Sequence, residues 1–524
     1  MNVDEERSRS LWMDLPSVEA PRLARDLSTD VLVIGAGIAG LSTAYELALR
    51  GRQVTVVDRG QPARGMSART SAHLASEIDD YYRKLFGVRG EAAARAWFES
   101  QSAAIDRIEQ VCRDEGIDCD FARVDGYLVP ASESDVPGLR EELAHSRLAG
   151  FTGAEWQERG PDPWSRLPAI RYPRQARFHP LRYLYGLLAA LGSRGVEVYG
   201  DTAVDELEER DGTVVARTTD GRNITARAVV VATNSPFHLR IPIHTKQAPY
   251  RTYVIAAQIP KGAVTDALVW DTVEPGYHYV RIQPGADHDV LIVGGEDHKT
   301  GADSHPSDHL DQLERWARAM YPAMGTVTHR WSGQVLEPSD YVPFIGRSPQ
   351  HELVWLVTGD SGEGLTTGVV ASLILGEQVT GGEHRWGELY EPSRKMLHGL
   401  REYLAENADA ARHWAAHLGG GEIDSVEELP AGHGAIARID GTTVAAYRTP
   451  GGDLKLHAAA CTHAGCVVRW NGFEQCWDCP CHGSQFSTDG EVLQGPAHRS
   501  LEPFVPETTS VRGRASEREH RPSP

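Results

Sequence analysis

The sequence contains no run of about eighteen consecutive apolar residues, the length that a membrane-spanning helix needs. Its first residues, MNVDEERSRSLWMD, are acidic and polar and lack the apolar stretch of a secretory signal peptide. These two absences predict a protein without a membrane span and, by default, a cytoplasmic location. A repeat with a period of about 20 to 50 residues is also missing, which argues against a repeat architecture.

Basic residues are too few to balance the acidic ones. The chain has 53 lysines and arginines against 73 aspartates and glutamates, a formal net charge of −20. Nucleic acids and anionic lipid surfaces are bound by basic patches, so this balance argues against both as partners. At 524 residues the chain also exceeds what one hydrophobic core normally supports, and we expect two or three domains.

Cysteine is scarce outside one short segment. Five of the seven cysteines lie between residues 461 and 481. The other two, Cys112 and Cys119, fall where the pattern predicts a helix followed by a turn. We interpret these two as buried free thiols and assign them no function.

The segment CTHAGCVVRWNGFEQCWDCPCHGS adds two histidines to those five cysteines. Cys461 and His463 form one short pair, Cys479 and His482 form another, and fifteen residues separate the pairs. This spacing suits two loops that close on one metal centre, whereas a disulfide framework would not need the histidines.

Two other interpretations of this segment are weaker. Zinc accepts two cysteines and two histidines, but its usual motifs pair cysteine with cysteine and histidine with histidine. Cys476 and Cys479 have the C-x-x-C spacing of a thioredoxin-like site, but such a motif opens a helix, and here Pro480 and another cysteine follow at once. We interpret Cys476 as an uninvolved thiol beside the site.

The segment DVLVIGAGIAGLSTAYELALRGRQVTVVDRG predicts a strand, a glycine-rich turn, a helix and a second strand. Gly35, Gly37 and Gly40 match G-x-G-x-x-G, and Asp58 lies eighteen residues beyond the last glycine. Glycines there let backbone N–H groups at a helix start approach a pyrophosphate, and the acid accepts hydrogen bonds from a ribose. The motif predicts a dinucleotide site but does not distinguish NAD from FAD.

Further segments predict how the domains are organised. A helix and strand pair at 180–204 and an apolar strand at 226–234 are expected to join the first sheet. The stretches 86–174 and 237–332 are richer in charge, tryptophan and tyrosine, and predict a substrate-facing domain inserted into the first. A helical stretch at 386–417 ends in a GGGE linker at 419–422, followed by short strands and a polar tail.

The order of several later motifs resembles the D-amino-acid oxidase-like (DAO) family of FAD-dependent oxidoreductases. The motifs are MSARTSAHLAS (66–76), FHPLRYL (178–184), VVVATN (229–234), WSGQVLEPSDYVPFIG (331–346) and LVTGDSGEGLTTG (356–368). The resemblance covers about residues 10–385. It implies that a helix start in the last segment points at the flavin, where its dipole stabilises negative charge.

The resemblance implies an α/β fold in which a Rossmann-like FAD-binding domain carries an inserted α+β substrate domain. We expect this module at 1–418, with FAD-binding parts at about 28–85, 175–236 and 333–385 and substrate-domain parts at about 86–174 and 237–332. The FAD contacts that it implies are Gly35, Gly37, Gly40, Asp58, Arg59, Ser67, Arg69, Thr70, His73, Asn234, Gly359, Gly364, Leu365 and Thr366. His73 falls near a position where some relatives attach flavin covalently, but its surroundings match that motif poorly, and we predict noncovalent binding.

The Cys/His pattern, with GPA at 495–497, resembles the Rieske iron-sulfur domain, a small all-β fold expected at 423–508 before a disordered tail at 509–524. The resemblance implies a 2Fe-2S cluster whose ligands are Cys461, His463, Cys479 and His482. It also implies a disulfide between Cys466 and Cys481. Further features that it implies are a Ser484 hydroxyl beside the cluster sulfide, a covering loop at Gly495 and Pro496, and Phe486 in place of a tyrosine that bonds a ligand sulfur in high-potential relatives.

Together the two resemblances predict a dehydrogenase that oxidises the C–N bond of an amine or amino acid and passes electrons from flavin through the cluster to an external acceptor. Two alternatives stay: a flavoenzyme that receives electrons through the cluster from an outside donor to reduce or hydroxylate a substrate, and a non-enzymatic redox sensor. We do not expect a Rieske oxygenase, because the forty-two residues after His482 are too few for its iron domain.

Residues on the predicted inserted sheet are the substrate-pocket candidates. They are Lys246, Arg251, Tyr253, Tyr277 and Tyr279. An arginine at such a position could clamp a carboxylate with two hydrogen bonds. The sequence identifies neither the substrate, the external redox partner nor the oligomeric state.

Overall fold

The computed structural model describes residues 8–239, 243–274, 276–301, 306–395, 421–423 and 425–506. The predicted tail at 509–524, most of the predicted helical stretch at 386–417 and the first two glycines of the linker lie outside these residues. Among the helices within them, none combines the length and the apolar character needed to cross a bilayer.

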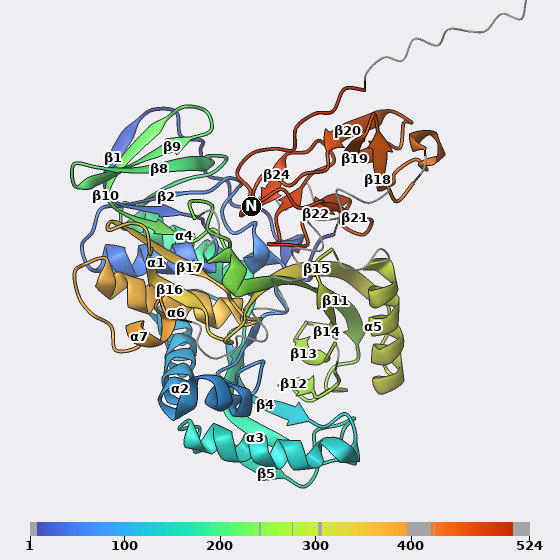
Figure 1. The fold of residues 1–524 in the computed structure, drawn as a ribbon. Coiled ribbons are helices and arrows are strands. Elements are labelled where there is room, and N and C mark those ends of the chain that lie inside the picture. The colour runs from blue at the N-terminus through green and yellow to red at the C-terminus, as the bar shows by residue number, and fades with distance from the viewer. Residues whose placement is uncertain are drawn as a thin grey trace, which may run out of the picture.

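An eight-stranded sheet carries the glycine-rich turn (Figure 1). Five neighbouring strands run parallel, and their apolar residues are buried on both faces, as is typical of parallel sheets covered by helices. The strands are, in spatial order, β16 (Phe344–Arg347), β17 (Val354–Thr358), β10 (Asn223–Val231), β1 (Leu27–Ile34), β2 (Val54–Val57) and β7 (Glu197–Tyr199), with β9 (Thr213–Thr218) and β8 (Val204–Arg210) added at β10. Helices α1 (Ile38–Leu49), α4 (Pro180–Ser193) and α6 (Gly364–Gln378) pack together on this sheet, α1 touching both others.

A nine-stranded sheet forms the inserted domain, and both predicted stretches contribute to it. The parallel pairing of β12 with β4 joins the two stretches. The strands are, in spatial order, β15 (Val327–Pro338), β11 (Gln247–Ile259), β14 (Asp289–Lys299), β13 (Tyr279–Gln283), β12 (Ala267–Asp271), β4 (Ala122–Val129), β6 (Ala169–Arg177) and β3 (His73–Leu74), with β5 (Glu155–Gln157) beside β6. β3 and the end of β15 lie outside the predicted ranges, because they carry the chain between the two sheets.

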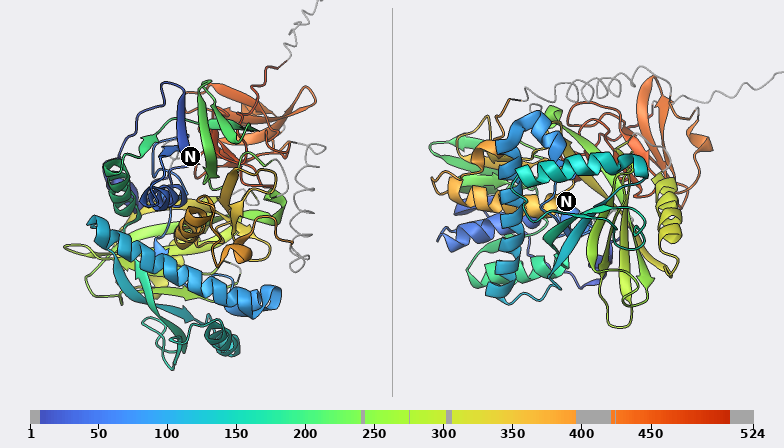
Figure 2. Two further views of the ribbon diagram at one scale, coloured as in Figure 1. Left: turned by 90° about the vertical axis from the view of Figure 1, so that its left-hand side faces the viewer. Right: turned by 90° about the horizontal axis from the view of Figure 1, so that it is seen from below.

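Helices cover both sheets. The long α2 (Tyr82–Glu115) packs on α3 (Val136–Leu148) and on α6, so it ties the two sheets together (Figure 2). Helix α5 (Pro306–Met320) packs on β11 and β14. The short α7 (Gly387–Tyr390) lies beside β16. Short 3-10 helices are η2 (Leu11–Asp14), η3 (Met66–Ala68), η4 (Glu133–Asp135), η5 (His244–Lys246) and η7 (Val426–Glu428).

The C-terminal domain is all-β, as predicted. It contains two antiparallel sheets, one of three strands and one of four. The strands are β18 (Gly434–Ile439), β19 (Thr442–Arg448) and β20 (Leu454–Ala458), and then β21 (Arg469–Asn471), β22 (Cys476–Asp478), β23 (Gln485–Phe486) and β24 (Val492–Gln494). This domain lies directly against the N-terminal module rather than extending away from it (Figures 1 and 2).

Candidate active site

The glycine-rich turn lies between β1 and α1, as the sequence predicts. Gly35 has φ +107°, and a Cβ added there would lie 2.3 Å from the carbonyl oxygen of Ala232. A Cβ on Gly40 would lie 1.8 Å from the carbonyl oxygen of Gly35. Side chains are therefore excluded at both positions, and the start of α1 packs closely on the neighbouring strand ends.

A large cavity opens at this turn and extends to the inserted sheet. Asp58 and Arg59 line it beside the turn, where the Asp58 carboxylate accepts hydrogen bonds from the backbone N–H groups of Ala36, at 2.6 Å, and Gly60, at 2.9 Å. Most of the residues predicted to contact FAD line the cavity. They are Gly35, Gly37, Asp58, Arg59, Ser67, Arg69, Thr70, His73, Asn234, Gly359, Gly364 and Leu365.

Two of the predicted FAD contacts do not line the cavity. Gly40 packs on the backbone of Gly35, so its role is to allow close packing of α1. Thr366 is buried and donates a hydrogen bond to the carbonyl of Glu363, while its neighbour Thr367 faces the cavity instead. Thr367 was not predicted, because the sequence motif does not show which of the two neighbouring threonines at the start of α6 faces the cavity.

The inserted sheet supplies the other end of the cavity. Tyr277 and Tyr279, both substrate-pocket candidates, line it together with Trp270. The Tyr279 hydroxyl lies 2.7 Å from the hydroxyl of Thr252, and the rings of Tyr277 and Tyr279 are 5.7 Å apart.

The structure corrects two other substrate-pocket candidates. Thr252 and Val254 of β11 line the cavity, whereas Arg251 and Tyr253 do not. Successive side chains of a strand point to opposite faces, so a one-residue difference in register moves a side chain to the other side of the sheet. Arg251 is bonded to Asp478 of the C-terminal domain.

Tyr253 and Lys246 have structural contacts instead. The Tyr253 ring stacks on His298 and His309, with centroid distances of 5.6 Å and 5.2 Å. The Lys246 ammonium donates to the carbonyls of Pro392 and Arg394. Neither residue lines the cavity.

Buried carboxyl groups lie at the inserted-sheet end of the cavity, and no sequence motif predicts them. Glu77, Asp79, Asp297 and Glu363 all line it. Burial, aided by the charge of Asp80, raises the pKa of Asp79 to about 7. Burial also raises the pKa of Asp297 to about 7, with a smaller effect of Glu296. The pKa values of Glu77 and Glu363 lie well above their usual range for the same reason, burial first and repulsion between the carboxyls second.

The four predicted cluster ligands come together in the C-terminal domain. The rings of His463 and His482 are 4.8 Å apart, and Cys461 and Cys479 are buried beside each other. A hydrogen bond from the Cys479 thiol, followed by backbone N–H groups and the Ser484 hydroxyl, lowers the pKa of Cys461 to about 7. Burial, with repulsion from His463, lowers the pKa of His482 to about 3, so its ring is neutral. Thiolate and neutral imidazole are the forms that ligate metal.

Other features of the Cys/His segment also agree with the sequence prediction. The disulfide between Cys466 and Cys481 is present and joins the two ligand loops. The Ser484 hydroxyl accepts a hydrogen bond from the backbone N–H of Ala497, at 3.0 Å, which ties the loop at 495–497 to the site. Cys476 is a buried thiol outside the disulfide, 3.5 Å from the carboxylate of Asp478. Cys112 and Cys119 are free, with their sulfurs 3.4 Å apart.

A third histidine, which sequence reasoning missed, covers the two ligand histidines. His244 belongs to η5 of the N-terminal module and is 1% exposed. Its ring lies 4.9 Å from that of His463 and 6.1 Å from that of His482. Burial, followed by repulsion from those two rings, lowers the pKa of His244 far below its usual value, so it is neutral. No motif surrounds His244 in the sequence, and only the fold brings it here.

Comparisons with known proteins agree with this geometry. The FAD dependent oxidoreductase family (DAO) matches residues 30–378, which is more than half of the chain. The chain belongs to this family. The Rieske 2Fe-2S domain family matches residues 421–505. The structure therefore combines a DAO flavoprotein module with a C-terminal Rieske domain, and its cofactors are FAD and a 2Fe-2S cluster.

Three known proteins are similar to this chain in sequence or in structure. YhfW of Bacillus subtilis, whose name describes a Rieske 2Fe-2S iron-sulfur protein, is 31% identical, and the match covers 93% of this chain and 95% of YhfW. Gamma-glutamylputrescine oxidoreductase of Escherichia coli is 24% identical over 70% of this chain and 86% of its own length. The crystal structure of glycine oxidase from Geobacillus kaustophilus superimposes with a TM-score of 0.59 at 18% identity, covering 70% of this chain and 99% of that one.

The residues present fit both cofactors. At the FAD site, the side-chain amide nitrogen of Asn234 is buried in the cavity wall and has no hydrogen-bond partner among the described residues, and the backbone N–H groups at the start of α1 face the same space. At the cluster site, the buried Nδ1 atom of His482 also lacks a hydrogen-bond partner within the described part of the chain. A polar atom that is buried and unsatisfied in this way is costly unless a ligand completes it.

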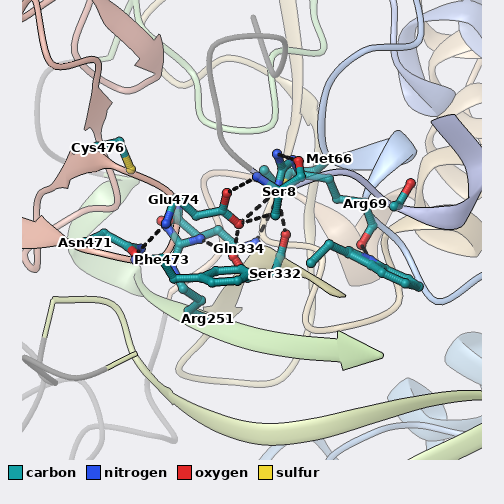
Figure 3. A network of polar contacts seen from close by, with 12 residues as sticks. Ser8, Met66, Arg69, Arg251, Ser332, Gln334, Asn471, Phe473, Glu474 and Cys476 are labelled. Atoms are coloured by element: carbon teal, nitrogen blue, oxygen red, sulfur yellow. Dashed lines mark hydrogen bonds and ion pairs between the residues drawn. The ribbon is translucent and has the colours of Figure 1, made fainter. Parts of the chain in front are cut away.

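The Rieske domain is fixed to the flavoprotein module by buried charges (Figure 3). Arg69 pairs with Glu474 of the Rieske domain at 3.0 Å, and neither side chain is exposed. Ser8 and Ser332 also donate hydrogen bonds to the Glu474 carboxylate. Burial alone would raise the pKa of Glu474, but Arg69 and then Arg251 hold it below its usual range.

A second buried pair lies next to the first. Arg251 of β11 contacts both carboxylate oxygens of Asp478, at 3.1 Å and 2.9 Å, and donates to the Ser332 hydroxyl at 2.7 Å. Asp478 directly precedes Cys479, a predicted ligand, in the chain. Arg251, a candidate for binding a substrate carboxylate, therefore binds a protein carboxylate at the domain interface.

Gln334 joins the cavity to the cluster site. It lines the cavity, and its side-chain amide donates a 2.9 Å hydrogen bond to the carbonyl of Gly483, the residue after His482, a predicted ligand. The Rieske residues Leu493, Gln494 and Gly495 also line the cavity. The FAD site and the cluster site thus share a wall.

Proposed function

We propose that the protein is a dehydrogenase that oxidises the C–N bond of an amine-type substrate at FAD and passes the electrons through its own Rieske cluster to an external one-electron acceptor. FAD accepts two electrons with a hydride, and a 2Fe-2S cluster carries one electron at a time. The substrate would leave as an imine after losing a hydride from carbon and a proton from nitrogen.

The shared wall carries this proposal. Gln334 lies in the cavity and bonds to the loop that holds His482, so a short covalent and hydrogen-bonded path connects the two cofactor sites. Two buried ion pairs hold that geometry without requiring the Rieske domain to move. A cluster fixed against a flavin cavity is suited to electron transfer within one chain.

The amine class is supported by the relatives rather than by a residue pattern. Gamma-glutamylputrescine oxidoreductase and glycine oxidase are both named for substrates that contain a C–N bond. Their sequence identities to this chain are only 24% and 18%, so the substrate of this chain has to be inferred from the residues that line its own cavity.

Anaerobic mixing with a panel of amines and amino acids tests the proposal. At least one compound should bleach the flavin without oxygen or any added reductant. A panel of dozens of diverse amines and amino acids with no response would overturn it. A flavin that bleaches only after an external donor reduces the cluster would favour the reverse direction, and a flavin that no small molecule reduces would favour a redox sensor.

A further inference from the structure

The inserted-sheet end of the cavity contains more negative groups than positive ones. Glu77, Asp79, Asp297 and Glu363 line it, and the only lysine or arginine side chains in the lining formed by the described residues are Arg59 and Arg69. Arg59 lies beside Asp58 at the nucleotide end. The guanidinium of Arg69 is committed to Glu474.

Nearby cations do not neutralise this group of acids. Lys84 lies 3.9 Å from Asp80 and 4.0 Å from Glu274, is 39% exposed and does not line the cavity. Arg83 contacts Glu142 on the outer side. Asp79 is hydrogen-bonded to Tyr277, and Asp297 to Thr252 with His278 nearby, so neutral hydroxyls and a histidine accompany these carboxyls, but no lysine or arginine of the described residues pairs with them inside the cavity.

Three of these carboxyls have a buried oxygen without a hydrogen-bond partner among the described residues. The atoms are Oε1 of Glu77, Oδ1 of Asp297 and Oε2 of Glu363. Glu77 is 3% exposed, and the charges that act on it come from Glu363, Glu142, Asp79 and Asp80, all of them acidic. Burying such an oxygen unsatisfied is unfavourable, and a cationic ligand would remove the cost.

Aromatic rings line the same end of the cavity. Tyr277 and Tyr279 lie 5.7 Å apart, and the His73 ring meets Tyr279 edge-on at 5.5 Å. Trp270 completes this part of the wall. The faces of aromatic rings attract ammonium groups, so the rings and the carboxyls favour the same kind of ligand.

Among the described residues that line this end of the cavity, no lysine or arginine is available to pair with a substrate carboxylate. The arginine that could have done so, Arg251, points to the opposite face of β11 and holds Asp478. The carboxylate of an α-amino acid would raise the pKa values of these acids further and would be repelled by their ionised forms, whereas an ammonium group stabilises the ionised forms.

We propose that this cavity binds an amine with at least two cationic nitrogens and no carboxylate, of the linear diamine or polyamine type. One nitrogen would lie at the reacting end, and the second among Glu77, Asp79, Asp297 and Glu363. The oxidation of this amine rests on the proposed function, whereas its binding rests on the cavity alone.

The raised pKa values of the carboxyls add a consequence. Asp79 and Asp297, with pKa values of about 7, hold a proton for part of the time near neutral pH. A bound dication favours the ionised carboxylates, so its binding should release protons. Titrations in buffers with different ionisation enthalpies should therefore give different apparent heats.

Isothermal titration of the FAD-loaded full chain without oxygen tests the proposal. The probes are diaminobutane, butylamine and aminobutyrate, which share a carbon chain and differ only in the group at one end. Diaminobutane should bind about tenfold more tightly than butylamine, and aminobutyrate should bind more weakly than either. Aminobutyrate binding as tightly as diaminobutane would overturn the proposal, and longer and shorter diamines would give the preferred spacing.

Two variants connect the binding to these carboxyls. Asp297→Asn and Glu77→Gln keep the shape of each side chain and should each weaken diaminobutane about tenfold while leaving butylamine within about threefold. Asp287→Asn, which changes an exposed aspartate on the turn before β14, is the matched control and should change neither affinity. FAD absorbance per chain and thermal unfolding confirm that each variant is folded. Unchanged diamine affinity in both folded variants would contradict the proposal.

The outcomes separate this inference from the proposed function. A diamine that binds tightly but never reduces the flavin would overturn the dehydrogenase proposal and leave the cationic site intact. An amino acid that reduces the flavin while no diamine binds would overturn the cationic site and support the dehydrogenase proposal.

Discussion

At the scale of single residues, hydrogen bonds near the cluster decide how readily it accepts an electron. Ser484 supplies one hydroxyl beside Cys461, while Phe486 is fully buried and has no donor to offer. Donors to cluster sulfur stabilise the reduced form and raise the potential. The resemblance to high-potential Rieske domains implies two hydroxyl donors, and this chain has the serine but a phenylalanine in place of the tyrosine.

Replacing Phe486 by tyrosine should raise the reduction potential of the cluster. A net hydrogen bond of about 1 kcal/mol corresponds to roughly 40 mV for one electron. Redox titration followed by electron paramagnetic resonance measures the change. A native potential already at the upper end of the Rieske range, or no upward shift in the variant, would show that the tyrosine hydroxyl has no role here.

His73 should bind FAD without a covalent bond. Its Nδ1 lies 3.0 Å from the Ser71 hydroxyl and its Nε2 lies 3.4 Å from the Val280 carbonyl, and burial lowers its pKa to about 3. Those contacts make it a neutral hydrogen-bonding neighbour. After acid precipitation the yellow colour should stay in the supernatant, whereas colour in the pellet that disappears in His73→Ala would reveal a covalent link.

The buried acids of the cavity should make stability depend on pH. A carboxyl whose folded pKa of about 7 exceeds its unfolded value stabilises the fold at low pH, and this contribution is lost as pH rises toward 7, at about 1.4 kcal/mol per pKa unit. The free energy of unfolding of the substrate-free protein should therefore fall between about pH 4 and about pH 7, by an amount on the order of several kcal/mol.

Denaturant titration at several pH values measures that fall. Asp297→Asn should show a shallower fall than the native chain, because one of the titrating groups is gone. An identical slope in the variant would mean that Asp297 does not titrate in this range.

At the scale of elements, strand register decides which residues reach the site. The sequence correctly predicted that the strand around Arg251 belongs to the inserted sheet, since alternation marks a half-buried strand. Alternation fixes the two faces but does not say which face meets the cavity. Which face of β11 meets the cavity depends on how β11 pairs with β14 and β15. It also depends on Asp478, which binds Arg251 on the other face and lies more than two hundred residues later in the chain.

The buried pair of Arg251 and Asp478 should matter for the interface. Their side chains are 2% and 3% exposed. Arg251→Met leaves the Asp478 carboxylate buried without its guanidinium and should cost about 3 to 5 kcal/mol of stability. Denaturant unfolding, followed by the cluster signal, measures the loss.

The matched control is Arg330→Met, which removes an arginine that is 39% exposed and pairs with Glu314 and Asp311. An exposed pair of this kind should contribute less than about 1 kcal/mol. Equal losses in the two variants would show that the interface pair is no more important than a surface pair.

At the scale of the whole molecule, the two cofactor sites could each be predicted from local motifs, but their relation could not. The G-x-G-x-x-G turn predicts where the backbone can approach a dinucleotide, and the Cys/His spacing predicts where a metal cluster can bind. Each motif lies within a few dozen residues of the chain. His244, Gln334 and Glu77 belong to no motif, because their roles arise only where distant segments meet. The domain interface and the acidic cavity end are therefore results of the fold.

The central claim is that electrons pass from flavin to cluster within one chain. Gln334→Leu, which removes the hydrogen bond to Gly483 while keeping a side chain of similar size, should slow that transfer, and because Gln334 also lines the cavity, substrate binding is measured separately in the variant. Flavin absorbance after reduction by the substrate gives the first phase, and the cluster signal gives the second.

Anaerobic stopped-flow mixing of the native protein with a reducing amine tests the claim most directly. The account predicts that the flavin bleaches first and that the cluster is then reduced at a rate independent of protein concentration. Reduction of the cluster before the flavin, or a second phase that accelerates with protein concentration, would contradict it.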